Sequence, residues 1–205
     1  MYRIVNIINN NVALVKNEKH EELMVTGSGI AFQKRKGDLI IGSKVDKVFR
    51  LNTEESKENF LTLLKDVPLD FITVTYDVID ALVVKYEYSV QEYLYVTLTV
   101  HIYCSYHAVQ KGTYQYSRLP DVSYEYPIEY AMAEEALAIF KTKLLDSFPD
   151  DEVGRIALHF INAKGEDVSS PTSKINRTKN ILELVKEELK ESQIERTKEN
   201  SNFYD

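Results

Sequence analysis

The stretch VTGSGIAFQKRKGD, residues 25–38, joins an apolar strand to a short run of cations. Its two glycines stand two residues apart, and glycine tolerates positive φ and lets another backbone come close. Phe32 offers a ring on which an unstacked base can lie, and the cations at 34–36 can neutralise phosphates. The stretch therefore predicts a small surface that faces nucleic acid. The plainer alternative is a solvated turn, since a GxG pair is weak evidence by itself.

Short strands flank this stretch on both sides. Runs of β-branched and aromatic residues are separated by turn residues, which is typical of an antiparallel meander. Asn9–Asn11 predicts a hairpin turn, because Asn tolerates the left-handed backbone that tight hairpins use. We expect a four-stranded antiparallel sheet with one apolar face, a sheet that would gain stability by pairing with a second copy. The strands are expected at 2–8, 12–16, 23–26 and 45–51.

Beyond residue 51 the apolar residues recur at helical spacing. Polar residues at 52–55 predict the start of a helix that ends near Pro68. Ser89 and Glu92 have the spacing of a capping box, which predicts a further helix start at Ser89. The fold class is therefore α+β, with a small four-stranded antiparallel sheet followed by an all-α helical bundle. The later helices are expected at about 69–86, 90–111, 128–145, 152–163 and 174–193.

Charge is distributed unevenly along the 205 residues. The net charge is −7, but residues 1–51 carry nine Lys/Arg against five Asp/Glu, and residues 52–205 carry sixteen against twenty-seven. The first segment is thus +4 and the second −11, so any nucleic acid is expected to contact the first segment. The single cysteine cannot form an internal disulfide, and there is no signal peptide or apolar run of membrane-span length. These features predict a cytoplasmic protein with no membrane insertion.

Enzymatic motifs are missing from the sequence. No group of His, Cys, Asp and Glu has the spacing of a structural zinc site, and no P-loop, Rossmann fingerprint, nucleophile elbow or HExxH occurs. We therefore expect no metal, no cofactor and no enzymatic activity. Eleven tyrosines lie between Tyr86 and Tyr130. In an acidic helical region they favour packing over base stacking.

Two histidines are candidates for chemistry. His101 shares a helical face with apolar residues, which also suits a core histidine with a hydrogen-bond partner. His159 lies one and two helical turns after Arg155 and Glu152. Such a stripe can hold a titrating or phosphorylated imidazole, with Arg as the anion partner and Glu as the orienting acceptor. Core packing remains the alternative for both residues.

Six motifs together resemble the BglG/LicT family of transcriptional antiterminators. VNIINNNVALV, VTGSGIAFQKRKGD and KVDKVFRL resemble its co-antiterminator RNA-binding domain, and LTVHI, YPIEYAMAEEAL and DEVGRIALHFINA resemble the first of its two PTS-regulation domains. The resemblance implies an RNA-binding domain at 1–55, a linker helix at 56–68 and a first regulation domain at 69–164. It also implies a linker and the start of a truncated second regulation domain at 165–205.

The resemblance further implies a homodimer that binds an RNA hairpin in nascent mRNA. The hairpin overlaps a terminator, so binding it lets transcription continue. The residues that match RNA-facing positions of the family are Asn11, Gly27, Ser28, Gly29, Phe32 and Gln33. Asn6 and Ser28 stand where relatives often have Lys and Arg, so two cations are missing.

His101 and His159 match the histidines through which phosphotransferase-system components, the sugar-specific enzyme II and HPr, regulate the first domain. The resemblance thus implies that both are phosphorylation sites. Val100 stands where relatives usually have an aspartate, which can orient and polarise the neighbouring imidazole. The alternative function is a dimeric phosphoacceptor or sensor module with no RNA binding.

Overall fold

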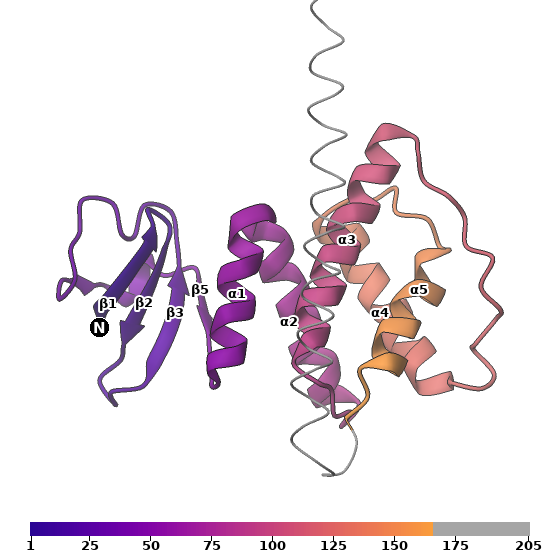
Figure 1. The fold of residues 1–205 in the computed structure, drawn as a ribbon, viewed down its shortest axis with the longest axis horizontal. Helices are drawn as coiled ribbons and strands as arrows, with labels where there is room; N and C mark the ends of the chain where they lie inside the picture. Colours follow the sequence, from indigo (N-terminus) through magenta and orange to yellow (C-terminus); the bar gives the residue numbers. More distant parts are fainter. Residues whose placement is uncertain (166–205) are drawn as a thin grey trace, which may run out of the picture. The chain divides into compact units, whose positions relative to one another are not determined.

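The computed structural model describes residues 1–165, which form two compact units divided after Glu58. The first unit is a sheet and the second a bundle of helices (Figure 1). The predicted α+β class is confirmed. Among the described residues, no helix combines the length and the apolar character needed to cross a bilayer.

The first unit, which we call the head, contains a five-stranded sheet in the order β4-β1-β2-β3-β5, with every neighbouring pair antiparallel. The prediction of four strands was therefore one short. The missing strand is β4, whose two residues are too few to show an alternating pattern. The strands are β1 (Tyr2–Asn9), β2 (Val12–Lys16), β3 (Glu22–Thr26), β4 (Leu39–Ile40) and β5 (Lys47–Phe49).

The β1–β2 hairpin closes through Asn10 and Asn11, but neither residue has positive φ. The expected left-handed asparagine conformation is therefore wrong for this turn. Instead the Asn11 N–H donates to Oδ1 of Asn9 at 2.8 Å, so a side chain supplies the turn's hydrogen bond. Asn side chains thus make this turn by hydrogen bonding rather than by unusual backbone angles.

Apolar residues are buried on both faces of the central strands. Leu23, Met24 and Val25 are consecutive in β3 and all three are at most 4% exposed. Because successive side chains of a strand point to opposite faces, both faces of β3 are covered. The expectation of one apolar face is therefore wrong. One of the two faces belongs to a continuous core of Ile4, Ala13, Val15, Leu23, Val25, Ile30, Ala31 and Ile40.

Five α-helices follow in the described part of the chain, and each overlaps a helix that the sequence predicted. The predicted helix at 174–193 falls outside the described residues. Thr53 accepts a hydrogen bond from the Ser56 N–H at 3.0 Å at the start of the first helix, and Gly112, with φ of 70°, ends the third. The helices are α1 (Glu54–Asp66), α2 (Leu69–Lys85), α3 (Tyr93–Lys111), α4 (Pro127–Lys143) and α5 (Glu152–Asn162).

The capping box predicted at Ser89 is wrong, because α3 begins four residues later at Tyr93. The segment before α3 instead pairs with the segment after α5. Gln91 N–H donates to the Ala163 carbonyl at 2.8 Å, and Gly165 N–H donates to the Ser89 carbonyl at 2.9 Å. This pairing joins the end of α5 to the start of α3.

In the second unit α2 packs on α3 and α4, and α5 packs on α4 and α3. The long connection from α3 to α4 runs along the outside of this bundle, beside α5 (Figure 1). This arrangement brings the middle of α3, the connection and α5 together. The largest fully buried side chains here are Phe60, Leu63, Ile72, Ile79, Leu82, Leu94, Phe140 and Phe160.

We predict that Thr53→Ala destabilises the protein by about 1 kcal/mol, because it removes the side-chain acceptor for the first turn of α1. The measurement is denaturant-induced unfolding followed by helical circular dichroism. Thr142→Ala, which removes a hydroxyl bonded to Ala138 O within a helix, is the control and should change stability by less than about 0.5 kcal/mol. Equal effects of the two substitutions would contradict the cap.

Candidate functional sites

Asn11 ties the loop after β3 to the β1–β2 hairpin. Its carbonyl accepts from Gly27 N–H at 3.0 Å and its Oδ1 accepts from Gly29 N–H at 2.8 Å. Asn10 adds a third bond, from Ala31 N–H at 3.0 Å. Among the described residues the Nδ2 amide of Asn11 has no partner, so it keeps two donors for another molecule.

In this loop, two buried side chains are followed by two side chains that face the solvent. Ile30 and Ala31 are 2% and 3% exposed and belong to the core of the head, whereas Phe32 is 58% exposed. Gln33 follows with φ of 56°, a left-handed conformation that is uncommon for a residue with a side chain. Both Phe32 and Gln33 are therefore presented to solvent from a firmly held backbone.

The two glycines of the loop serve different purposes. A Cβ on Gly27 would lie 2.4 Å from the Lys44 carbonyl oxygen and 2.6 Å from Cγ2 of Ile30. The backbone that comes close to buried Gly27 is thus the chain's own. A Cβ on Gly29 would make only an ordinary contact, 4.0 Å from Cβ of Phe32, but Gly29 adopts φ of 63°, which side chains disfavour.

Three cations follow Phe32 without carboxylate partners among the described residues. Lys34, Arg35 and Lys36 make no ion pair there, and the nearby Asp38 carboxylate accepts the Arg35 backbone N–H at 2.8 Å instead. By contrast, Lys57 of the head pairs with Glu22 at 3.0 Å. The loop therefore combines an exposed ring with unneutralised positive charge.

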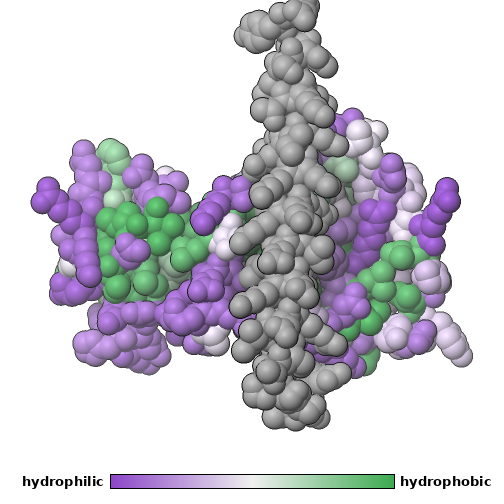
Figure 2. Space-filling view, viewed as in Figure 1, coloured by the Kyte–Doolittle hydropathy of each residue, from purple (hydrophilic) through white to green (hydrophobic). Residues whose placement is uncertain are grey.

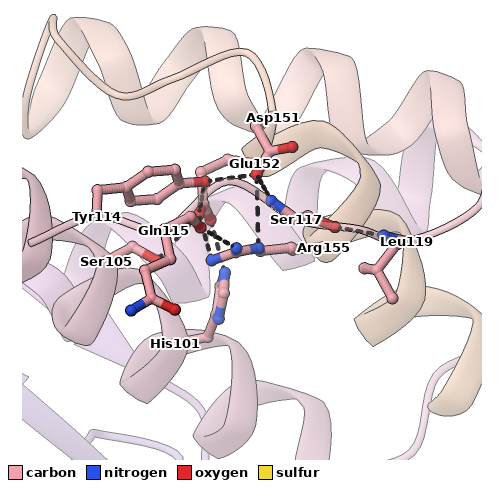
Figure 3. A network of polar contacts seen from close by, with 9 residues as sticks. All are labelled: His101, Ser105, Tyr114, Gln115, Ser117, Leu119, Asp151, Glu152 and Arg155. Carbon is pink, nitrogen blue, oxygen red and sulfur yellow. Dashed lines mark hydrogen bonds and ion pairs between the residues drawn. The ribbon is translucent and has the colours of Figure 1, made fainter.

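A second candidate site lies in the helical unit, where His101 of α3 meets His159 of α5. Their ring centroids are 4.9 Å apart. Nε2 of His101 lies 2.6 Å from Oε2 of Glu152, which stands in the first turn of α5 (Figure 3). The two histidines that the sequence singled out separately are thus one site.

Glu152 is the centre of a polar network. Its carboxylate has no exposed surface and accepts from Ser105 Oγ at 3.1 Å and from Tyr114 OH at 2.7 Å, while Arg155 Nη1 lies 3.6 Å away. Burial raises the pKa of the carboxyl, but the hydrogen bond and charge of His101, helped by Tyr114 and Arg155, outweigh it and lower that pKa overall. Glu152 is therefore an ionised acceptor at neutral pH.

The connecting segment 114–119 is held over this site by α5. Asp151 accepts from Ser117 N–H at 2.8 Å and from Tyr114 OH at 3.0 Å, and Arg155 donates to the Gln115 carbonyl. Figure 3 shows Arg155 between the two carboxylates and the segment. The segment thus depends on the same charges that surround His101.

Both histidines line an open groove of about 860 Å³ between the connecting segment and α5. Arg118 also lines it, is exposed, and has no ion-pair partner among the described residues. Burial, together with the charge of His101, lowers the pKa of His159, and Glu152 opposes this only in part. The groove therefore holds a neutral imidazole at His159 and a cation at Arg118.

Comparison with known proteins places the chain in a family. The family models of the CAT RNA binding domain and the PRD domain match residues 2–58 and 76–163. The transcription antiterminator LacT of Lacticaseibacillus casei is 44% identical over 205 residues, which cover 100% of this chain and 70% of LacT. The chain belongs to the BglG/LicT family of RNA-binding transcription antiterminators.

Two further relatives agree with this assignment. The transcription antiterminator LicT of Bacillus subtilis (strain 168) is 35% identical over 204 residues, covering 98% of this chain and 73% of LicT. The crystal structure of GlcT CAT-PRDI superposes with a TM-score of 0.62 at 30% identity, covering 80% of this chain and 99% of that one. LacT and LicT are transcription antiterminators, not enzymes.

In this antiterminator the three positions that the sequence resemblance marked as departures have distinct surroundings. Asn6 and Ser28 are exposed, so a cation at either position would lie at the surface. Val100 is 1% exposed and belongs to the core. Among the described residues, no three His, Cys, Asp or Glu side chains are grouped as metal ligands.

Sequence reasoning missed part of the histidine site of the antiterminator. Glu152 was recognised as a helical neighbour of His159, but its hydrogen bond is to His101 on another helix. Ser105 shares the helical face of His101, one turn further on, as the sequence indicates, but its bond to Glu152 of another helix was not expected. Tyr114 has no such signal, since it lies in a segment without periodic pattern and 38 residues from Glu152.

We predict that Gly27→Ala destabilises the head more than Gly29→Ala does. The first substitution forces a Cβ against a backbone oxygen and should cost about 1–3 kcal/mol or more, as overpacking does. The second makes no clash and should cost about 1–2 kcal/mol for its left-handed backbone. Thermal unfolding of the two variants is the measurement, and a reversed order would contradict the packing at Gly27.

We also predict that His159 makes the helical unit acid-sensitive. Its folded pKa lies below the ordinary value of 6.5, so its contribution to stability is complete above pH 6.5 and is lost as the pH falls below that value. Denaturant unfolding at a series of pH values should therefore show stability falling as the pH is lowered from about 6.5 toward the folded pKa of about 3. His159→Gln should reduce this slope. An unchanged slope would show that His159 titrates normally.

Proposed function

We propose that this antiterminator acts in the cytoplasm as a homodimer that binds a hairpin in nascent mRNA overlapping a terminator. We further propose that phosphorylation of His101 and His159 by phosphotransferase-system components, namely the sugar-specific enzyme II and HPr, controls this binding. The observation that carries the proposal is the loop after β3, where exposed Phe32 stands beside three cations, Lys34 to Lys36, that make no ion pair within residues 1–165.

The RNA site combines three kinds of contact. Phe32 offers a face for an unstacked base, and Asn11 Nδ2 and the Gln33 amide offer donors to base edges. Lys34–Lys36 supply charge for phosphates. Gly27, Ser28 and Gly29 support this surface by setting the course of the loop, and Ser28 is itself exposed.

The surface of the head supports a dimer. Figure 2 shows hydrophobic residues gathered over β1 to β3 on the face turned toward the viewer, with hydrophilic residues around them. An apolar area of this kind is costly in water and favours a partner. A second copy would bring a second RNA-binding loop, and two loops suit the two sides of an imperfect hairpin.

The groove suits regulation by phosphorylation. A phosphoryl group adds about −1.5 to −2 charges at neutral pH. Here it would arrive next to buried Glu152 and within reach of Arg118 and Arg155, which line the same groove. Such a change alters the balance of charges that holds the connecting segment, and we propose that it favours one arrangement of the dimer over another.

We predict that Phe32→Ala weakens binding to the cognate hairpin by about tenfold or more, since stacking of a base on an aromatic ring contributes about 1–3 kcal/mol. Phe32→Tyr keeps the ring and should bind nearly as well as the native chain. The measurement is a titration of the 205-residue chain with the hairpin at two salt concentrations, with a scrambled hairpin as the reference for specificity.

Equal, weak binding of both RNAs by the native chain would overturn RNA recognition and favour a dimeric phosphoacceptor module. Unchanged affinity of Phe32→Ala, with specific binding by the native chain, would remove only Phe32 from the site. Circular dichroism of each variant shows that the fold is kept.

A further inference from the structure

We propose that Glu152 is the positioning residue of His101 and directs phosphoryl transfer to Nδ1 of that histidine. The inference rests on the proposed control by phosphorylation and deepens it, because it names the accepting atom and the group that prepares it. The carboxylate comes from α5, whereas His101 lies on α3.

The hydrogen bond determines the tautomer of the ring. An ionised carboxylate can only accept, so the bond of 2.6 Å between Nε2 and Oε2 requires the hydrogen on Nε2. The ring must be neutral to accept a phosphoryl group, and with its hydrogen on Nε2 the lone pair then lies on Nδ1. Among the described residues Nδ1 has no hydrogen-bond partner, so its lone pair is available.

Nε2 is the less available of the two ring nitrogens, because it is already bonded to a buried acid. The Nε2 corner of the ring faces a carboxylate with no exposed surface, whereas the side chain as a whole is 19% exposed and lines the groove. A donor that attacked through Nε2 would first have to break a charge-assisted bond to a buried acid. Such bonds are among the stronger ones in proteins, and the freed carboxylate would remain buried with one donor fewer.

The chemistry of transfer explains what the carboxylate contributes. The Nδ1 lone pair forms a new bond to phosphorus, and the bond between phosphorus and the nitrogen of the donor breaks, with its electron pair leaving on that nitrogen. The ring becomes positively charged while its Nε2 proton stays in place. Glu152 stabilises this charge through the existing hydrogen bond.

The remaining contacts hold Glu152 for this task. Ser105 and Tyr114 each donate to its other oxygen, Oε1, which leaves Oε2 directed at the histidine. Val100 cannot take this role, because it is an apolar residue in the core. Glu152 of α5 therefore supplies the carboxylate that Val100, the neighbour of His101 in the sequence, cannot.

The first test identifies the nitrogen in the native chain. The 205-residue protein, labelled with ¹⁵N at histidine, is phosphorylated with phosphoramidate, a small donor with a labile phosphorus–nitrogen bond. Ring ¹⁵N shifts before and after the reaction assign the tautomer and the modified atom. We expect the Nε2–H tautomer before reaction and the phosphoryl group on Nδ1 of His101 afterwards.

The second test measures the effect of the carboxylate. Glu152→Gln keeps the size of the side chain and removes its charge, and we expect phosphorylation of His101 to slow by about tenfold or more, as loss of a charge-assisted bond implies. Glu152→Asp restores the charge and should recover part of the rate. Glu135→Gln is the matched control, because Glu135 also accepts from a tyrosine, Tyr86 at 2.6 Å, but lies away from the groove.

The outcomes separate this inference from the proposed function. Phosphoryl transfer to Nε2, or equal rates in Glu152→Gln and Glu135→Gln, overturns the role of Glu152 and leaves control by phosphorylation standing. No transfer to His101 of the native chain, from phosphoramidate or from phosphorylated HPr, overturns both. Transfer to Nδ1 that depends on the charge at position 152 supports both.

Discussion

A carboxylate without exposed surface has to be surrounded by donors, because an isolated buried charge costs several kcal/mol or more. Glu152 meets this constraint with donors from three parts of the helical unit: His101 and Ser105 of α3, Tyr114 of the connecting segment, and Arg155 of its own helix. Because the buried Glu152 carboxylate needs these donors, it positions His101 and holds the connecting segment over the groove. The burial of one charge thus explains both the arrangement of the segment and the orientation of the histidine.

In the head, uncharged backbone N–H groups likewise need hydrogen-bond partners. The backbone of the loop after β3 has no regular strand partner, yet its N–H groups need acceptors. Asn11 provides two of them, one from its carbonyl and one from its side chain. Buried Ile30 and Ala31 then hold the loop against the sheet, and Phe32 is left outside. An exposed aromatic ring on a firmly held backbone is suited to recognition, since little freedom remains to be lost on binding.

Agreement between sequence and structure depended on the length of each element. The helices α2 to α5 have eleven residues or more, which is enough for a 3.6-residue period to show. Strand β4 has two residues and shows no period at all. The capping motif at Ser89 was overridden because its backbone pairs with the segment after α5, a contact that no local pattern reveals.

The sequence by itself determined the α+β class, the positions of the helices, the loop with Phe32, and the two histidines as candidates. Each of these depends on residues close together in the chain, where periodicity, turn chemistry and charge can be read directly. Only the tertiary structure decided that His101 and His159 share one groove, that Glu152 serves His101, and that Gly27 is buried beneath Lys44. These facts join residues 17 to 58 positions apart, and such pairs are set by packing between elements rather than by any local preference.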